Sequence, residues 1–290
     1  MAKSKEVQAL GKLNKQRVRP STVILYIILI AGTLVSLVPL YWMFRSSVMS
    51  NAEIFVFPPL FFPSTWRWQN YVKTFQNFAA LMYLRNTLWI LVPCVIGTVL
   101  TSAMAGYSLG RLNYPGRNLW FILTIGAMIL PGHVVLIPQY LTYSAVRLTN
   151  TYWPFYLAAW FGGGASNVFL MRQFMRTLPK DYDESAMIDG ASRVQIFLRI
   201  LVPLCAPIMI TVAIFSFMAY WNDFQGPLIY LRSDTKFTLA LGILSLRGAY
   251  SSKWNYIMAA SLVMVVPAII LFAIGQRYFI EGIVLTGVKG

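Results

Sequence analysis

Charge is scarce in this sequence, and acidic residues are the scarcest. Only 11% of the 290 residues are charged, with nine Asp or Glu against 24 Lys or Arg. A soluble domain of this length carries about twice that charged fraction. With 58% hydrophobic residues and a mean hydropathy of +0.61, the excess apolar side chains must face lipid. The net charge of +15 does not indicate nucleic acid, because the basic residues are spread through loops between long apolar runs.

Histidine and cysteine, which supply many catalytic and metal sites, are also nearly absent. The chain has one histidine, His133, and two cysteines, Cys94 and Cys205, in separate apolar runs. Because these cysteines form no CxxC or metal-spaced cluster, we expect both to be small core residues. The sequence also lacks a G-x-x-x-x-G-K-[ST] loop to cradle phosphates. We therefore expect no catalytic residue, no metal site and no cofactor bound by this chain.

Long apolar runs are abundant, and they predict an all-α integral membrane protein. Each of six stretches reaches the roughly 17–25 residues that a helix needs to cross a bilayer. The fourth is broken by Gly162–Gly164, so we expect it to pack against neighbours or to line a cavity. The first follows a basic N-terminal segment, as a signal peptide would. However, its apolar run is too long for a signal peptide and no cleavage site is evident, so we expect an uncleaved span. The six expected spans are 23–44, 88–110, 118–141, 152–170, 200–222 and 258–280.

The distribution of basic residues predicts the orientation of these spans. If the N-terminus is cytoplasmic, fifteen Lys and Arg lie on the cytoplasmic side and nine on the opposite side, whose loops are longer in total. This bias favours both termini inside.

A polar segment, 181–203, interrupts the apolar pattern. Asp181 is followed three residues later by Glu184, which is the spacing of a capping box, and Pro179 ends the preceding helix. We expect a short helix over 182–189, closed by Gly190 in the left-handed conformation. The segment holds four of the nine acidic residues: Asp181, Asp183, Glu184 and Asp189.

A second helix-start signal follows at once. Ser192 and Gln195 repeat the capping-box spacing, and Pro203 and Pro207 predict a break or kink where the segment enters the fifth span. The residues at i, i+3, i+4 and i+7 are apolar and form one stripe along this helix: Val194, Phe197, Leu198 and Leu201. Two capped helices beneath a membrane suit a docking surface for a cytoplasmic partner, although an ordinary cytoplasmic loop with good caps fits the same pattern.

The spacing of this segment resembles a family motif. Glu184-Ser-Ala-x-x-x-Gly190, nine residues, then Ile200-x-Val202-Pro203 is similar to the EAA motif of permease subunits in binding-protein-dependent ABC importers. That motif reads Glu-Ala-Ala, three residues, Gly, nine residues, Ile, one residue, Leu-Pro. This chain departs from it at Ser185 and Val202 and keeps the spacing.

Other stretches are similar to the carbohydrate branch of that family, and to its six-helix, maltose-importer type. They cover nearly the whole chain and are strongest over 84–290. They include Asp189–Ser192, Phe197, Ile200, Pro203-Leu204, Tyr220–Phe224, Leu130–Gly132 and Gly287–Gly290. The resemblance implies a type I importer permease fold with four regions: 1–22, a basic cytoplasmic N-terminus; 23–83, the first helix and an external segment; 84–280, the core permease domain; and 281–290, a cytoplasmic tail.

The resemblance also implies a mechanism and partners. The chain would form half of a pore in a bacterial cell membrane, together with a second permease subunit, two cytoplasmic ATPases that hold ATP and magnesium, and an external solute-binding protein. The polar segment would be a coupling helix seated in a cleft of the ATPase, where Glu184 meets a basic residue. The residues expected to couple are Asp181, Glu184, Ser185, Ala186, Asp189, Gly190, Ala191 and Ser192.

The substrate implied by the resemblance is a carbohydrate, most simply an oligosaccharide. Sugars bind to aromatic faces and planar polar groups, although aromatic belts at membrane interfaces use the same residues, and His133 has the alternative of bonding a carbonyl freed at a proline kink. Candidates for the substrate pathway are His133, Gln139, Tyr140, Trp160, Asn167, Trp221, Asn222 and Asp223. In the external loop 223–257, Arg247, Tyr250 and Lys253 are candidates for contact with the binding protein, or simply solvated residues.

One rival function is a secondary transporter driven by an ion gradient. Such a protein would show internal repeats and buried ionisable residues, and neither is evident, since spans two to four contain no Asp or Glu. A membrane enzyme would need a nucleophile–base pair or a metal cluster, which one histidine and two scattered cysteines do not supply.

Overall fold

A computed structural model describes residues 20–77, 79–249 and 253–287, and within these ranges every regular element is a helix. The elements in chain order are α2 (Pro20–Ser47), α3 (Asn51–Ile54), α4 (Gln69–Asn77), α5 (Ala80–Arg111), α6 (Arg117–Ile129), α7 (Gly132–Ala145), α8 (Trp153–Trp160), α9 (Ala165–Thr177), α10 (Asp181–Ile188), α11 (Arg193–Ile196), the π-helix η1 (Phe197–Leu201), α12 (Val202–Leu204), α13 (Ala206–Trp221), α14 (Gln225–Tyr230), the 3₁₀-helix η2 (Asp234–Lys236), α15 (Leu239–Ala249) and α16 (Trp254–Gly287).

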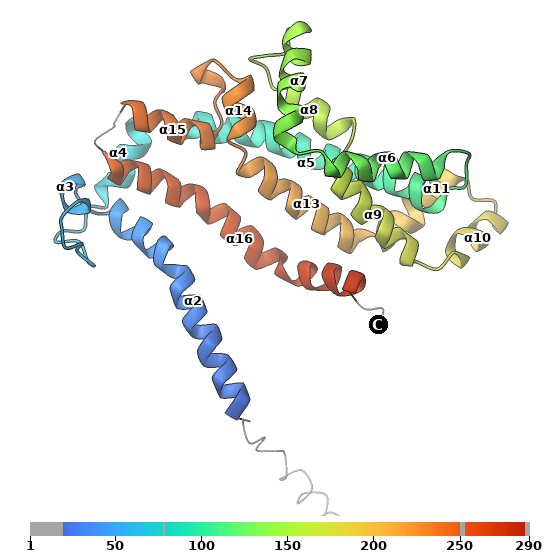
Figure 1. Ribbon diagram of the computed structural model, residues 1–290, viewed down its shortest axis with the longest axis horizontal. Coiled ribbons are helices and arrows are strands. Elements are labelled where there is room, and N and C mark those ends of the chain that lie inside the picture. Colours follow the sequence, from blue (N-terminus) through green and yellow to red (C-terminus); the bar gives the residue numbers. More distant parts are fainter. Residues whose placement is uncertain (1–19, 78, 250–252, 288–290) are drawn as a thin grey trace, which may run out of the picture.

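The long helix α5 is the centre of the bundle, where α8, α9 and α13 pack against it (Figure 1). Two glycines let neighbours approach closely. A Cβ on Gly106 would lie 2.6 Å from the Cβ of Met171 in α9, and one on Gly97 would lie 2.6 Å from the indole nitrogen of Trp160 in α8. The apolar helix α5 is therefore shaped to receive these two partners.

Two of the expected spans are not continuous helices. The stretch 118–141 is divided into α6 and α7, which meet at an angle of 102°, because Pro131 disfavours the helical conformation at Leu130 before it. The stretch 152–170 is divided into α8 and α9, with Gly163 and Gly164 at φ values of +60° and +80° between them. The expectation of one unbroken span was therefore wrong for 118–141, whereas the glycine break in 152–170 was predicted.

The fifth span is also bent at its start. The segment Arg193–Leu204 meets α13 at 76°, and Pro203 and Pro207 both lie within the first two residues of a helix that begins there. Among the described residues, three helices are long and apolar enough to cross a membrane: α2, α5 and α16 over Trp254–Gly275. The count rises to five if each bent pair is one span.

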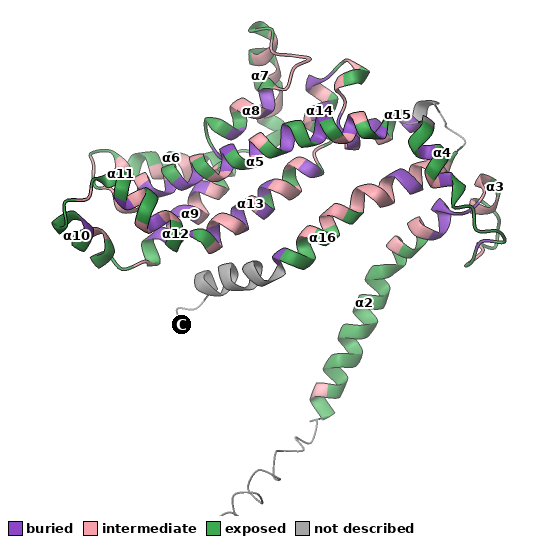
Figure 2. Ribbon diagram, turned by 180° about the vertical axis from the view of Figure 1, so that it is seen from behind, coloured by how far each residue is buried: buried purple, intermediate pink, exposed green. Residues whose placement is uncertain are grey.

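The helix α2 leaves the bundle. Only its C-terminal end, Arg45–Ser47, is buried, and most of the rest is exposed along an apolar surface (Figures 1 and 2). The buried end is fastened by Asn70, whose Nδ2 donates to the carbonyls of Ser47 at 2.8 Å and Met49 at 2.9 Å. Lipid or another protein must cover the remainder of α2, since an apolar surface of this length is unfavourable in water.

Candidate functional site

The helix α10 does not begin as expected. It spans Asp181–Ile188, its N-cap is Lys180, and no side chain caps it. Pro179 holds Leu178 extended (φ −71°, ψ 139°), and Lys180 is already helical and accepts the amides of Asp183 and Glu184 at 2.9 and 3.1 Å. Asp181 therefore lies inside the first turn, and the predicted capping box between Asp181 and Glu184 was wrong.

The end of α10 follows the prediction. Gly190 has φ +82°, its amide donates to the carbonyl of Met187 at 3.1 Å, and the next amide, that of Ala191, reaches back to Ala186 at 2.9 Å. These two bonds form a Schellman motif, which requires the left-handed residue that glycine supplies without strain.

The second predicted capping box is confirmed at the start of α11. The Oγ of Ser192 accepts the amide of Gln195 at 3.3 Å, and the Gln195 Oε1 accepts the amide of Ser192 at 2.7 Å. The apolar stripe beyond it is only partly buried, because Val194 and Leu198 are 65% and 56% exposed.

The register of this stripe changes because a π-helix intervenes. The fully buried residues are Ile196 and Leu201, which are five positions apart, and η1 between them has the wider i→i+5 hydrogen bonding. Of the four residues in the apolar stripe, Leu201 is therefore fully buried, and the other fully buried position is Ile196, which lies outside the stripe.

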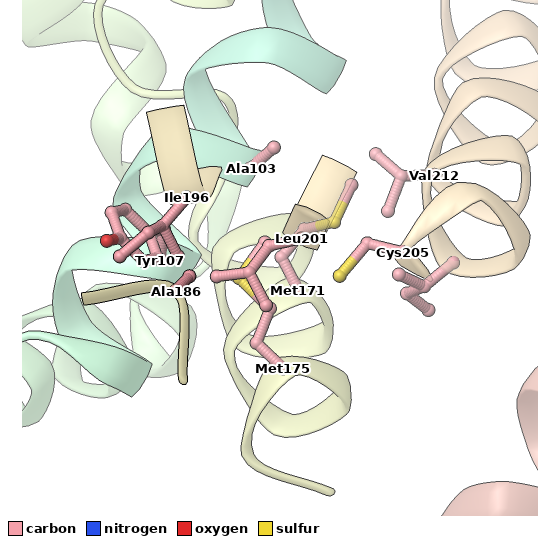
Figure 3. Packing of buried hydrophobic residues seen from close by; sticks show 10 residues of the cluster. Ala103, Tyr107, Met171, Met175, Ala186, Ile196, Leu201, Cys205 and Val212 are labelled. Carbon is pink, nitrogen blue, oxygen red and sulfur yellow. The ribbon is translucent and has the colours of Figure 1, made fainter. Parts of the chain in front are cut away.

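The segment is seated on a core formed by α5, α9 and α13. Ala186 is the buried residue of α10, and it lies beside Tyr107, Met171 and Met175 in one cluster (Figure 3). The Tyr107 ring stacks on Phe197 at 5.1 Å, and its hydroxyl donates to the carbonyl of Arg193 at 3.2 Å. Because Ala186 is buried in this cluster, a larger side chain at its position would push α10 away from the bundle.

A buried arginine at the end of α5 holds the start of α10, and the sequence did not reveal it. The Arg111 Nη1 donates to the carbonyls of Met175 at 3.2 Å and Leu178 at 2.7 Å, and its Nη2 donates to Pro179 at 2.7 Å. Its Nε lies 2.8 Å from Oδ2 of Asp183, in an ion pair whose side chains are 3% and 16% exposed. We call Arg111, Asp183 and these three carbonyls the arginine clamp.

The outer face of α10 is exposed and mixed in chemistry. Glu184, Ser185 and Asp189 are exposed, and Ile188 is 87% exposed beside Met187 at 41%. A groove of about 380 Å³ runs along the adjoining turn, lined by Ala186, Asp189, Gly190, Ala191, Gln195, Arg199 and Ile200. Apolar and acidic side chains on one exposed surface are suited to a protein partner that carries basic residues.

One candidate for the substrate pathway, Asn167, lines a cavity within the bundle. This cavity, of about 480 Å³, lies between α5, α8, α9 and α13, and its polar lining includes Thr98, Ser166, Ser216 and Tyr220. The Asn167 Nδ2 donates to the carbonyl of Gly163 at 2.8 Å, so the glycine break positions this amide. Trp160 lies elsewhere, in an apolar groove of about 520 Å³ with Trp89 and Trp153.

The other candidates are dispersed. The His133 Nδ1 lies 3.3 Å from the Gln225 Nε2, rather than on a carbonyl freed at the kink. On α7, Gln139 is exposed, and the Tyr140 hydroxyl accepts a hydrogen bond from Arg232 at 2.8 Å.

The residues at the end of α13 serve local structure. Trp221 is 4% exposed and donates to the carbonyl of Met264 in α16 at 2.9 Å. Asn222 donates to the Met218 carbonyl at 2.9 Å. Asp223 accepts the amide of Gly226 at 3.0 Å, and burial raises the pKa of its carboxyl.

Of the expected contacts with a binding protein, Lys253 is exposed and its Nζ lies 5.6 Å from the ring centroid of Tyr256. Tyr250 and the side chain of Arg247 lie outside the described residues.

Comparison with known proteins decides the family. Residues 97–284 match the model of the family described as binding-protein-dependent transport system inner membrane component. The chain belongs to this family. It is therefore a permease of an ATP-driven, binding-protein-dependent system and not a secondary transporter.

Individual relatives agree with this assignment. The arabinooligosaccharides transport system permease protein AraQ of Halalkalibacterium halodurans is 35% identical, over 80% of this chain and 82% of that protein. The diacetylchitobiose uptake system permease protein NgcG of Streptomyces coelicolor is 29% identical, over 86% and 83%. A chain in the crystal structure of a bacterial ABC transporter that imports the acidic polysaccharide alginate has a TM-score of 0.79 at 20% identity, covering 92% of this chain and 99% of that one, which supports the fold.

Proposed function

We propose that this chain forms half of the translocation pore of an ATP-driven importer for a carbohydrate, most simply an oligosaccharide. The observation that carries the proposal is α10, which is fixed to the bundle on one side and exposed on the other. Relatives named for arabinooligosaccharides and diacetylchitobiose support the substrate class. The polar cavity at Asn167 and Tyr220 gives sugar hydroxyls hydrogen-bonding partners inside the bundle.

The proposed role of α10 is to couple an ATPase to the pore. In this proposal the exposed carboxylate of Glu184 meets a basic residue of the ATPase, while Ser185, Asp189 and the groove at Gly190–Ser192 complete the contact. The arginine clamp joins the start of α10 to both α5 and α9. Movement of α10 would therefore be transmitted to the two helices that line the Asn167 cavity, rather than absorbed by a flexible loop.

The proposed assembly contains a second permease, two cytoplasmic ATPases that hold ATP and magnesium, and an external binding protein. The exposed apolar length of α2 supports the second permease, because a splayed helix of this kind suits an intersubunit contact within the bilayer. In this proposal both termini and α10 lie in the cytoplasm of a bacterial cell, and α3, α4 and α15 lie outside it.

The test is reconstitution of the four-part assembly in vesicles with its binding protein. We expect uptake that requires ATP and the binding protein and that persists when ion gradients are collapsed. Glu184→Ala should lower substrate-stimulated ATP hydrolysis by at least about tenfold, because truncating one partner of a buried interfacial charge pair costs roughly 2–5 kcal/mol. Its unfolding temperature should stay unchanged, since Glu184 caps nothing in its own chain.

Lys180→Ala is the control, because it removes an exposed charged side chain immediately before the same helical turn, at a position outside the expected coupling residues. It should retain most of the coupled activity. Full coupling in Glu184→Ala would exclude the proposed contact, and uptake that followed a proton gradient without ATPase subunits would overturn the proposed function.

A further inference from the structure

The helices α3 and α4 and the start of α16 lie at the opposite end of the molecule from α10 (Figure 1). A second, larger cavity lies among them. Its volume is about 670 Å³. It is separate from the coupling segment and from the Asn167 cavity. Its described lining residues are Ser50, Asn51, Thr65, Trp66, Arg67, Trp68, Gln69, Asn70, Lys73, Asn255 and Tyr256.

One wall of this cavity is a fixed aromatic platform. The rings of Trp66 and Trp68 stack with centroids 5.9 Å apart and an interplanar angle of 15°, and Tyr71 continues the stack behind Trp68 at 6.4 Å. Phe44 of α2 packs against both indoles. The two tryptophans nevertheless remain 50% and 56% exposed, so they present apolar surface that is held in place and still accessible.

The opposite wall is polar and rigid. The Asn51 Oδ1 accepts the amide of Trp254 at 2.9 Å, and the ring of Trp254 packs edge-on against Phe55 at 6.3 Å. These contacts fasten the first turn of α16 to α3. Asn70, in the same lining, is held by its two hydrogen bonds to backbone carbonyls of the α2 end.

One polar atom of this wall lacks a partner. Asn255 is 7% exposed, and its Oδ1 makes no hydrogen bond with any described residue. A buried carbonyl oxygen left without a donor costs about 1–3 kcal/mol. Because this oxygen is itself fully buried, the Asn255 side chain must turn toward the cavity for a donor there to reach it. A phosphate or carboxylate supplies only acceptors, whereas a hydroxyl supplies the donor that this amide needs.

We propose that this cavity is a saccharide-binding subsite, in which a sugar ring stacks on Trp66 and Trp68 and donates a hydroxyl to Asn255. The proposal rests on the proposed function, which places this end of the molecule outside the cell. A pyranose offers an apolar face to the indoles and hydroxyls to the amides, and so matches both walls. Arg67 and Lys73 line the cavity and none of its described lining residues is acidic, so a sugar acid is not repelled. The site would hold an incoming saccharide at the mouth of the pore.

The test uses the assembled transporter in lipid nanodiscs without its binding protein. Maltotetraose, cellotetraose and trigalacturonate serve as probes, and binding is read by saturation-transfer NMR and by quenching of tryptophan fluorescence. We expect at least one probe to bind the wild type. Trp68→Ala should weaken that binding by at least about tenfold, as loss of a central aromatic contact does, and Asn255→Leu by about fivefold, as loss of one hydrogen bond does. Trp153→Ala, which removes an equally exposed tryptophan at another site, is the matched control and should bind normally.

Each outcome is decisive. Trp66→Ala provides a second removal of the platform if Trp68→Ala fails to assemble with the ATPases. The subsite proposal is overturned if no probe binds the wild type. It is also overturned if the wild type and the cavity variants bind the probes equally well. Weaker docking of the binding protein in Trp68→Ala, with no saccharide signal, assigns the cavity to that protein instead. If binding-protein-dependent uptake continues in either case, the proposed function stands without the subsite; if the wild type shows no uptake, the proposed function fails independently.

Discussion

Two helix starts near Gly190 carry the same spacing of capping residues, and they are held in different ways. Ser192 and Gln195 cap α11 reciprocally, whereas Asp181 and Glu184 make no cap at the start of α10. The difference arises from what precedes each helix. An extended residue at Ser192 (φ −70°, ψ 158°) aims its hydroxyl at the helix, whereas Lys180 is already helical.

This difference has a consequence for coupling. The start of α10 depends on a partner from a distant helix, Arg111, and its own carboxylates are divided between two roles. Asp183 faces inward to the arginine clamp, and Glu184 faces outward and is exposed. If Glu184 capped α10, its carboxylate could not bind an external partner at the same time. Because the arginine clamp holds the start of α10 instead, the Glu184 carboxylate stays available to a partner.

The largest effect is expected from removing the clamp. Arg111→Ala leaves the Asp183 carboxylate without its ion-pair partner and three carbonyls without their donor, and it should reduce the free energy of unfolding by about 3 kcal/mol, as loss of one partner of a buried ion pair does. Thermal unfolding of the purified assembly checks this, and limited proteolysis should cleave near Pro179. Arg111→Lys keeps the charge but not the forked donors and should fall between wild type and Ala. An unchanged unfolding temperature in Arg111→Ala would show that α10 does not depend on the clamp.

A smaller loss is expected at the turn that both helices share. Gly190→Ala places a Cβ at φ +82°, with open space around it, so the cost is backbone strain of about 1–2 kcal/mol. Gly126→Ala is the matched control, since Gly126 also has open space but lies inside α6 at an ordinary φ. It should be neutral or stabilising by up to about 1 kcal/mol. Equal behaviour of the two variants in thermal unfolding would contradict the Schellman motif.

The two helix starts can then be compared directly. Ser192→Ala should cost about 1 kcal/mol because it removes a working cap, and Asp181→Ala should cost less than about 0.5 kcal/mol because Asp181 caps nothing. Hydrogen exchange of the amides of α10 and α11 measures both. A larger effect from Asp181→Ala would restore the capping box that the structure excludes.

The smallest effect concerns pH and a third capping box, at the start of α3. Ser50 and Glu53 cap each other there, and the bond from the Ser50 amide lowers the pKa of the Glu53 carboxyl below its usual value near 4.5. The stabilisation that this capping box gives to the folded state is therefore fully present at pH values above the usual pKa. It is lost as the pH falls through the lowered pKa of Glu53 in the folded state. Hydrogen exchange at Ser50–Glu53, corrected for its intrinsic pH dependence, should rise on acidification. The box at Ser192 and Gln195 has no titrating group and should not respond.

The sequence was sufficient to predict those features that depend on residues within about one helical turn of each other. The φ of Gly190 and the cap at Ser192 depend on residues within about four positions, and both were predicted. Arg111 and Asp183 were not paired, because no local pattern joins the end of α5 to α10. Val194 and Leu198 of the apolar stripe are exposed because η1 departs from the 3.6-residue period. The sharp bend at Pro131 within 118–141 could not be predicted from the proline alone. Whether a proline gives a mild kink or a sharp bend depends on how the helices on both sides of it pack.

Among the predicted pathway residues, side-chain type did not determine position. Trp221 has the aromatic face expected of a sugar contact, yet it is buried against α16. Trp66 and Trp68 were not among the predicted pathway residues, yet they wall the largest of the cavities described above. Tertiary packing determines which tryptophan faces a cavity, and residue spacing in the sequence does not predict that packing.

Crosslinking can identify what the outer face of α10 contacts in the assembly. A cysteine at Ile188, which is 87% exposed, can be joined to nearby lysines by a short heterobifunctional reagent, because the native Cys94 and Cys205 are buried. In membranes that contain the whole assembly, Ile188→Cys should form an adduct with the ATPase subunit, and Trp66→Cys at the opposite end should form none. An adduct with the ATPase from Trp66→Cys, or none from Ile188→Cys in an assembly that still transports, would contradict the role of α10 as the coupling helix.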